Sequence, residues 1–179
     1  MGALPAAMTI PLADVPSLAP VLDVLFAEAD SVRCGHRLIA DRLFEVVLIQ
    51  LLRWVLAHAA ELGLPPGLLA GLSDPDLTPA LVAVHEAPGA QWSLTGMAQA
   101  ARMSRSAFAA RFKTVVGMAP GEYLTQWRLT IAQSRLRDGE PVGVVARDLG
   151  YVNASSFSRV FTRHLGASPR HWLADSPLP

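Results

Sequence analysis

The sequence is poor in cysteine and in charged residues. Among its 179 residues there is a single cysteine, Cys34, so no disulfide bond can form within the chain, as is usual in the reducing cytosol. Charged residues make up 17% of the chain and hydrophobic residues 51%, which excludes the polar composition of a disordered protein. We therefore expect a folded cytoplasmic protein with a substantial hydrophobic core.

A membrane anchor and a secretion signal are also missing. The longest apolar stretch, Leu43–Leu52, is interrupted by Glu45 and Gln50 and is too short to cross a bilayer. No run of Lys or Arg precedes an apolar segment at the start of the sequence, as a signal peptide requires. We expect a soluble protein that has no contact with a membrane.

Residues that would support catalysis or metal binding are sparse. Cys34 and His36 offer two ligands, too few for a zinc site, and His58 and His85 lack ligand-like spacing. No set of Ser, His and Asp, no Gly-rich phosphate loop and no carboxylate pair stands out. We expect no enzyme activity, no cofactor and no metal. A redox sensor at Cys34 would need an exposed thiol, and a buried or incidental thiol is the simpler interpretation.

The net charge of zero conceals an asymmetry along the chain. Residues 1–73 carry four Arg and seven acidic residues, a net charge of −3, whereas residues 74–179 carry eleven Lys or Arg and eight acidic residues, a net charge of +3. From Pro88 onward only five acidic residues remain and the net charge is +6. A basic C-terminal part is the electrostatic pattern that a DNA-contacting surface requires.

Turn-forming residues divide the chain into helical segments. Apart from a short extended piece near Thr9–Leu12, no segment alternates between polar and apolar residues, so we expect an all-α fold. Helices are predicted over residues 18–29, 37–62, 67–71 and 78–86, the last with Thr78 as N-cap and Pro79 as first helical residue. The longest of them carries a broad apolar face, made of Leu43, Val46, Val47, Leu51, Trp54 and Val55.

The C-terminal part contains an internal repeat with a period of 49 residues. Five identities stand in register, and Tyr123 matches Trp172 in kind. The identical pairs are Ser106 with Ser155, Phe108 with Phe157, Phe112 with Phe161, Gly117 with Gly166 and Pro120 with Pro169. One supersecondary unit therefore occurs twice.

Each copy has the pattern of a short helix, a tight turn and a second helix. In the first copy, residues 94–101 form the short helix with Ser93 or Thr95 as cap, and Ser104 caps a second helix that ends near Val116. We expect Leu94, Met97 and Ala98 to face inward, together with Phe108, Phe112 and Val115. Gly117 closes the helix and Pro120 forbids its continuation. This is helix-turn-helix geometry.

The second copy repeats this order. Residues 142–149 form its short helix, Gly150 and Tyr151 its turn, and Asn153 caps a helix that ends near Leu165. Gly150 stands where a positive φ is needed. Residues 121–137 form a connecting helix about 25 Å long, which could hold two recognition helices near the roughly 34 Å spacing of successive major-groove faces.

These residues carry a family resemblance over about 100 of the 179 residues. Segment 74–174 resembles the bipartite DNA-binding domain of the AraC/XylS family of bacterial transcription regulators. The first copy and connecting helix contribute Trp92-Ser93-Leu94, Met97-Ala98, residues 103–108, Arg111-Phe112-Lys113, Gly117, Pro120, Tyr123-Leu124 and Trp127-Arg128. The second copy contributes residues 144–151, residues 155–161, Gly166 and Ser168-Pro169.

The resemblance also assigns the rest of the chain. Residues 1–73 resemble the helical segment that follows the sensory cupin barrel in one branch of the family, so we expect a helical linker and dimerisation subdomain, and residues 175–179 form a tail. The barrel itself is missing, apart from at most the stretch before Pro16. The missing barrel argues against a site for a small-molecule effector and leaves open whether any effector is sensed.

The two buried Phe of each recognition helix determine which face is free to meet DNA. The predicted DNA contacts of the first copy are Ser104, Arg105, Ser106, Ala109 and Lys113, and those of the second are Ala154, Ser155, Ser158, Arg159, Thr162 and Arg163. Arg159 suits a bidentate contact to guanine, whereas Lys113 and Arg163 lie late in their helices and suit phosphates. Arg102 and Arg137 are expected to be surface or ion-paired groups, and Arg128 a bridge between the halves.

Two functions are compatible with this pattern. The first is a sequence-specific regulator of transcription, expected to be an activator, with double-stranded DNA as partner, RNA polymerase as a further one, and a homodimer formed through residues 18–62. The alternative is a truncated interaction module that pairs with a full-length relative through its N-terminal helices. Salt-dependent DNA binding distinguishes the two, because only a DNA-binding protein releases counterions from the duplex.

Overall fold

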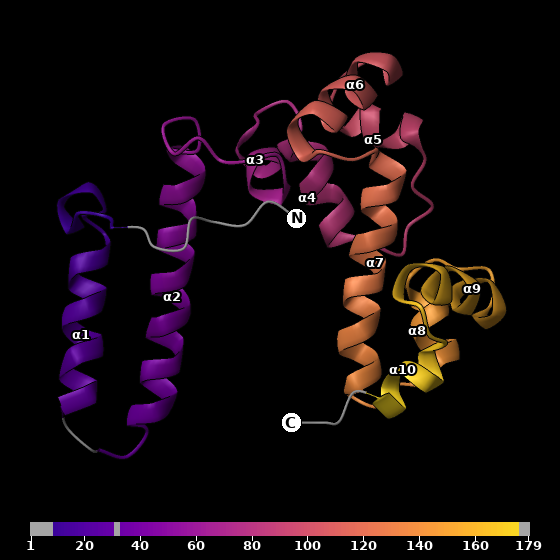
Figure 1. Ribbon diagram of the computed structural model, residues 1–179. Helices are drawn as coiled ribbons and strands as arrows, with labels where there is room; N and C mark the ends of the chain where they lie inside the picture. The colour runs from indigo at the N-terminus through magenta and orange to yellow at the C-terminus, as the bar shows by residue number, and fades with distance from the viewer. Residues whose placement is uncertain (1–8, 31–32, 176–179) are drawn as a thin grey trace. The chain divides into compact units, whose positions relative to one another are not determined.

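The chain is described by a computed structural model that covers residues 9–30 and 33–175 (Figure 1). The described residues form helices and no β-strand, so the predicted all-α fold of two helix-turn-helix units joined by a long helix is confirmed. They divide into two compact units, Met1–Ser73 and Asp74–Pro179. Of the expected C-terminal tail, residues 176–179 lie outside the described residues.

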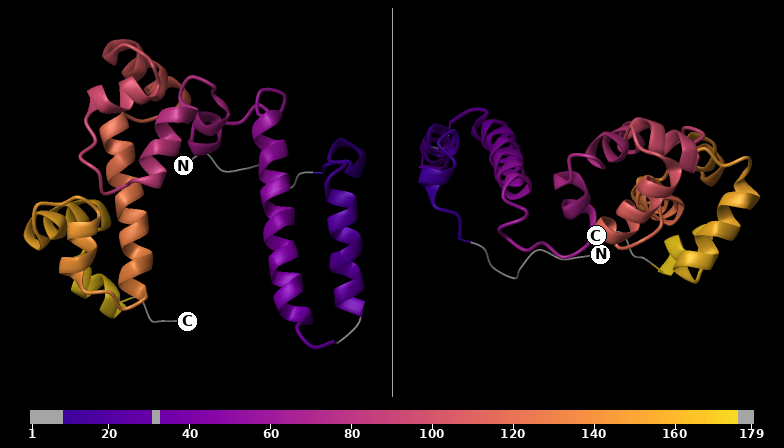
Figure 2. Two further views of the ribbon diagram at one scale, coloured as in Figure 1. Left: turned by 180° about the vertical axis from the view of Figure 1, so that it is seen from behind. Right: turned by 90° about the horizontal axis from the view of Figure 1, so that it is seen from above.

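The first unit is a helical hairpin followed by a short helix. Its elements are η1 (Leu12–Asp14), α1 (Leu18–Asp30), α2 (His36–Ala57) and α3 (Leu68–Ser73). Helices α1 and α2 lie side by side (Figure 2). Val15, Leu18 and Val47 are buried between them, with Leu51 and Trp54 packed against this small core. Much of the apolar surface of both helices stays exposed.

Two expectations for the first unit are wrong. The extended piece near Thr9–Leu12 gives way at Leu12 to the 3-10 turn η1, because Asp14 N donates to Pro11 O at 3.0 Å. Helix α2 ends at Ala57, five residues before the predicted end. The His58 ring stacks on Trp54, and its Nδ1 lies 2.9 Å from Trp54 O, so this side chain occupies the helix end. The chain then turns toward Gly63, which has a φ of 56°.

The second unit begins with three helices, α4 (Thr78–Glu86), α5 (Leu94–Ala100) and α6 (Arg105–Val116). Thr78 was predicted to be the N-cap of α4, but it is the first residue of the helix. Its hydroxyl donates to Asp74 O at 2.7 Å. The Asp74 carboxylate accepts from the backbone N–H groups of Asp76 and Leu77, in the turn just before the helix, and α4 itself has no side-chain cap. Of the two candidate caps of α5, Ser93 accepts from Gly96 N.

Four helices complete the second unit: α7 (Pro120–Arg137), α8 (Val142–Asp148), α9 (Ala154–Leu165) and α10 (Pro169–Asp175). Helix α7 is the connecting helix, and it contacts α5 and α6 as well as α8 and α10. A buried cluster unites α7, α8 and α9, and its members are Leu129, Ala132, Leu136, Val145, Ala146, Leu149, Phe157 and Phe161. One helix therefore carries both helix-turn-helix units.

The repeat is present in the structure, but its turns differ by one residue. Met103 N donates to Ala98 O in the first helix-turn-helix, and Tyr151 N donates to Ala146 O in the second, both at 2.9 to 3.0 Å. This pairing has an offset of 48 residues, whereas the recognition helices α6 and α9 are related by 49. The extra residue of the second turn is Val152, which lies between Tyr151 and the N-cap Asn153.

The left-handed position of each turn is also conserved between the copies. Gly150 has the expected positive φ of 79°, and a Cβ on it would lie 2.3 Å from Gly89 O. Arg102 takes the equivalent place with a φ of 52°, the one positive φ among the described non-glycine residues. Two inward-facing predictions are wrong: Leu94 is 41% exposed, and Val116 rather than Val115 is buried beside Phe112, because the buried face of α6 follows a spacing of four residues from Phe108.

Candidate nucleic-acid interface

Helix α6 has one buried face and one free face. Phe108 and Phe112 are buried, with ring centroids 5.4 Å apart. Ser104 caps the helix by accepting from Ala107 N at 3.2 Å, and Gly117 ends it with a φ of 84°. The predicted contact residues lie as follows: Ser104, Arg105, Ser106 and Lys113 are exposed, and Ala109 is half-buried. The free face of α6 is thus short of cations near its centre.

Arg111, a further cation of α6, is engaged elsewhere. Its Nε lies 3.0 Å from Asp74 Oδ2, and its Nη2 lies 3.2 Å from Asp76 Oδ2. The Asp74 side chain is 9% exposed, and its carboxylate both accepts from the turn before α4 and binds the recognition helix. The paired carboxylates raise the pKa of Arg111. This contact fixes α6 against the loop that precedes α4.

Helix α9 presents a richer free face. Asn153 forms a capping box with Ser156, Gly166 ends the helix with a φ of 79°, and Phe157 and Phe161 are fully buried. The predicted contact residues Ala154, Ser155, Arg159, Thr162 and Arg163 are exposed, and Ser158 is half-buried. Four residues line a shallow depression of about 460 Å³, namely Ser158, Arg159, Thr162 and Arg163.

The two cations of this face are available for a ligand. Within the described part of the chain, neither Arg159 nor Arg163 has a carboxylate partner, whereas Arg135 and Arg147 do. Guanidinium groups without intramolecular partners keep all their donors for a bound anion or a base edge. Together with the exposed hydroxyls of Ser155 and Thr162, they give the free face of α9 both cationic and neutral hydrogen-bond donors.

A charged network holds α8 and α7 together behind the recognition helix. Arg135 of α7 binds both Glu140 and Asp148, with 2.8 Å between its Nη2 and Asp148 Oδ2. The guanidinium lowers the pKa of both carboxyls, and they in turn raise the pKa of Arg135. Arg137 lies 4.7 Å from the centroid of the Trp172 ring, so the expectation of a surface group holds with an added aromatic contact.

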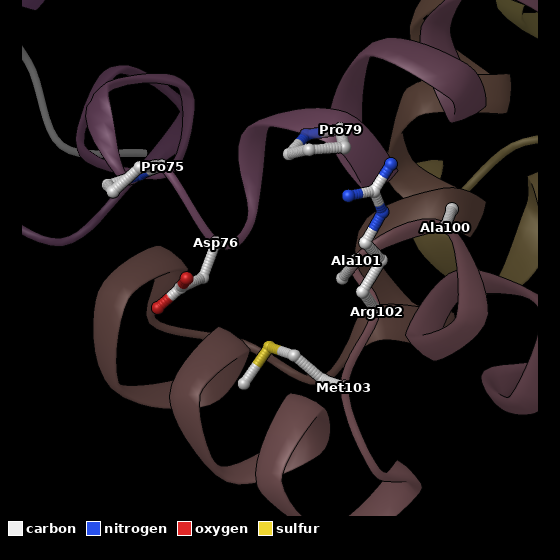
Figure 3. Close-up of a pocket in the computed structure, with 7 residues that line it drawn as sticks. All are labelled: Pro75, Asp76, Pro79, Ala100, Ala101, Arg102 and Met103. Carbon is white, nitrogen blue, oxygen red and sulfur yellow. The ribbon is translucent and has the colours of Figure 1, made fainter.

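A second cavity lies beside the turn of the first helix-turn-helix, between α5 and α6. It measures about 490 Å³, and Figure 3 shows Asp76 and Arg102 projecting from different sides of it, with Met103 below. Its remaining walls are Pro75, Pro79, Ala100 and Ala101. None of these residues is among the predicted DNA contacts, so the cavity is separate from the proposed contact surface.

Three further features of the described residues concern a metal site, the single thiol and a membrane span. No cluster of three or more His, Cys, Asp or Glu in the described ranges could hold a metal ion. Cys34 is exposed, not buried, but it is a lone thiol beside the start of α2. Among the helices that the structure describes, none is long and apolar enough to span a membrane.

Sequence reasoning missed two features of this surface. The Asp74–Arg111 contact joins residues 37 positions apart, and an acidic residue just before a helix was the one signal for it. Val152 was missed because the repeat was aligned on the recognition helices, which hides a one-residue difference in the turns. In the second turn, only the N-cap Asn153 separates Val152 from the start of α9.

The fold and the free faces define a protein with tandem helix-turn-helix units. A helix-turn-helix domain family model matches residues 97–175, and a cupin family model matches residues 1–57. The chain is 42% identical over 143 residues to a protein described as an AraC-like transcription regulator from Streptomyces antibioticus, a match covering 79% of this chain and 46% of that one. It is 33% identical over 150 residues to the transcriptional regulator AlkR of Acinetobacter baylyi, covering 83% and 48%.

A solved structure is similar to the second unit. The DNA-binding domain of the global transcriptional factor AdpA, crystallised with a target DNA, matches with a TM-score of 0.52 and 31% identity, over 57% of this chain and 92% of that one. The chain belongs to the AraC/XylS family of transcription regulators. It spans about half the length of the curated relatives named above.

Proposed function

We propose that the chain binds double-stranded DNA through α6 and α9 and thereby regulates transcription. The observation that carries the proposal is the pair of exposed, polar helix faces held on one helix, α7. Its 18 residues correspond to a length of about 27 Å, close to the roughly 34 Å between successive major-groove faces. The likeness to AdpA, whose DNA-binding domain was solved with target DNA, supports the same reading.

The two helices have unequal roles in this proposal. On α9, Arg159 makes a bidentate contact to guanine O6 and N7, while Ser155 and Ser158 reach base edges or phosphates. Arg163 and Lys113 bind phosphates, because both stand late in their helices. On α6, Ala109 offers only methyl contacts. The remaining proposed contacts are Ser104, Arg105, Ser106, Ala154 and Thr162.

The electrostatics of the surface suit this partner. Arg105 and Lys113 on α6, and Arg159 and Arg163 on α9, have no carboxylate partner among the described residues. Each phosphate that such a cation neutralises releases a condensed counterion, and this release drives association. The basic C-terminal part of the chain therefore favours a polyanion over a neutral ligand.

We further propose that the chain forms a homodimer through α1 and α2. The exposed large apolar residues of these helices are Val24, Phe26, Leu38, Ile39, Phe44, Val46, Leu48, Ile49 and Leu52. A hairpin with so much exposed apolar surface gains free energy by packing against a second copy. A regulator of this kind acts in the cytoplasm at the nucleoid and, as an activator, contacts RNA polymerase.

The same apolar helices favour one alternative, an interaction module that pairs with a longer relative and does not read DNA. Binding to random-sequence duplex over a range of salt concentrations separates the two. For a regulator, we expect the logarithm of the binding constant to fall steeply with the logarithm of the salt concentration, and a selected sequence to bind more tightly than random DNA. Absence of binding at low salt would contradict the proposal and leave the interaction module.

A further inference from the structure

The most exposed large apolar side chain of the described residues is Val152, at 94%. The next in the second unit, Leu94, is 41% exposed. Val152 lies in the turn between α8 and α9, one residue before the N-cap Asn153. An isolated β-branched side chain that is almost entirely in water contributes nothing to packing at this site.

The fold itself gives Val152 no role. A residue in this position commonly packs against the fourth residue of the following helix, here Phe157. Tyr151 makes that contact instead, with its ring centroid 5.2 Å from that of Phe157 in an edge-to-face arrangement. In the first helix-turn-helix the turn is one residue shorter, and Met103 immediately precedes the cap Ser104. Val152 is thus the added residue of the second turn, and the packing of this turn is complete without it.

Val152 lies beside the N-terminal end of the recognition helix α9. The N-terminal residues of such a helix contact base edges. Ala154 and Ser155, the first two residues of α9, are exposed beside Val152. No charged residue stands between Asp148 and Arg159, so this end of α9 is apolar and hydroxylic, and its cations follow one turn later.

The chemistry of the side chain selects its partner within duplex DNA. A valine has no donor or acceptor, so it can bind neither a phosphate nor a polar base edge. The C5-methyl group of thymine is the apolar group that the major groove exposes. We propose that Val152 is a specificity-determining residue that reads the C5-methyl group of a thymine in the segment bound by α9. This inference rests on the proposed entry of α9 into the major groove.

The test removes the methyl group from either side of the contact. Each thymine of the α9 segment in a selected site is replaced in turn by deoxyuridine, which lacks only the methyl group. For the wild-type chain, we expect one replacement to weaken binding about three- to tenfold, the loss of one buried apolar contact. Val152→Ala should weaken binding to the thymine site by a similar factor and should be insensitive to deoxyuridine at that position.

A matched control comes from the same unit. Val82 of α4 is 40% exposed and belongs to neither recognition helix, so Val82→Ala should retain the full sensitivity to deoxyuridine. Both substitutions truncate a surface valine, and unchanged circular dichroism and thermal unfolding would exclude a folding defect. The inference is overturned if Val152→Ala binds as tightly as wild type, if it keeps the deoxyuridine effect, or if the α9 segment has no fixed thymine. Failure of the wild type to bind any duplex would instead remove the proposed function, and the inference with it.

Discussion

The guanidinium carbon of Arg128 lies 5.7 Å from the centroid of the Tyr151 ring, so that α7 contacts the turn between α8 and α9 directly. The same side chain donates from Nε to Pro88 O at 2.7 Å and from Nη2 to Ala90 O at 2.8 Å, in the loop before α5. Burial lowers the pKa of Arg128. These contacts are those expected of a residue that bridges the two halves, because one side chain links the loop before α5 to the turn between α8 and α9.

Replacing Arg128 should therefore weaken the fold and loosen the link between the two helix-turn-helix units. In Arg128→Ala, two carbonyl groups lose a charged donor, and we expect the free energy of unfolding to fall by about 1–3 kcal/mol. Chemical denaturation measures this. Arg137→Ala is the control, because Arg137 is exposed and its cation lies over the half-buried Trp172 ring, so that this replacement should cost about 0.5–1 kcal/mol. Equal losses in the two variants would contradict a bridging role.

The half-buried histidine of α4 makes a pH-dependent contribution to stability. His85 stacks on Trp127, with ring centroids 4.2 Å apart, and its Nε2 lies 2.5 Å from the Tyr123 hydroxyl. Burial lowers the pKa of His85 below its ordinary value of 6.5 and raises the pKa of Tyr123, so the hydroxyl can donate to a neutral ring. Below about pH 6.5 the unfolded chain binds a proton that the folded chain resists, and folding becomes less favourable.

We therefore expect the free energy of unfolding to be constant with respect to His85 above about pH 6.5 and to fall as the pH drops toward the lowered pKa. Thermal unfolding at a series of pH values measures this, and His85→Gln should lose this part of the dependence. Tyr123→Phe keeps the apolar surroundings and should keep the dependence, since burial is its cause. A pH profile unchanged by His85→Gln would contradict the assignment.

Two arginines of α9 should differ in what they contribute to DNA binding. Arg159→Ala is expected to cost about 1–3 kcal/mol of binding free energy and to relax the preference at one base position. Arg163→Ala should weaken binding to all sequences alike and reduce the salt slope by about one. Fluorescence titrations against a selected site and its single-base variants measure both. Uniform weakening by Arg159→Ala would move this residue from base contact to phosphate contact.

Dimerisation through the hairpin makes a prediction about α2. Phe44 and Leu48 are four residues apart, and their side chains are 61% and 58% exposed. If two copies pack through this surface, replacing both by Ser removes buried apolar area from the interface and should yield a monomer. Sedimentation at tens of micromolar gives the answer, with Val82→Ser in the second unit as the control. A wild-type chain that is already monomeric there would contradict the dimer.

Local sequence signals predicted much of the fold, because Gly, Pro and capping residues mark helix ends directly. Gly117, Gly150 and Gly166 have the positive φ that their positions require, and Ser104 and Asn153 accept from the helix starts as expected. The errors arose where a nearby residue competed for the same role. Thr78 donates from its N–H and its hydroxyl to Asp74 O and so becomes the first residue of α4. The His58 ring stacks on Trp54 at the point where α2 ends, although the apolar pattern continues.

The candidate surface was predictable in outline, since two buried Phe in each recognition helix leave one face free. Which cations on that surface are free depends on contacts that periodicity does not encode. Arg111 binds Asp74, 37 residues earlier, while Arg159 keeps its donors. The exposure of Val152 also required the structure, because it follows from Tyr151 taking the contact with Phe157.

Selection of bound sites from random duplex DNA by the purified chain tests the central claim most directly. The account predicts that each bound chain selects two unlike segments, with centres about 10 base pairs apart, because α7 holds two different recognition helices one groove turn from each other. The segment under α9 should hold the more invariant positions, including a guanine for Arg159. Enrichment of one short segment per chain, or no enrichment at all, would contradict it.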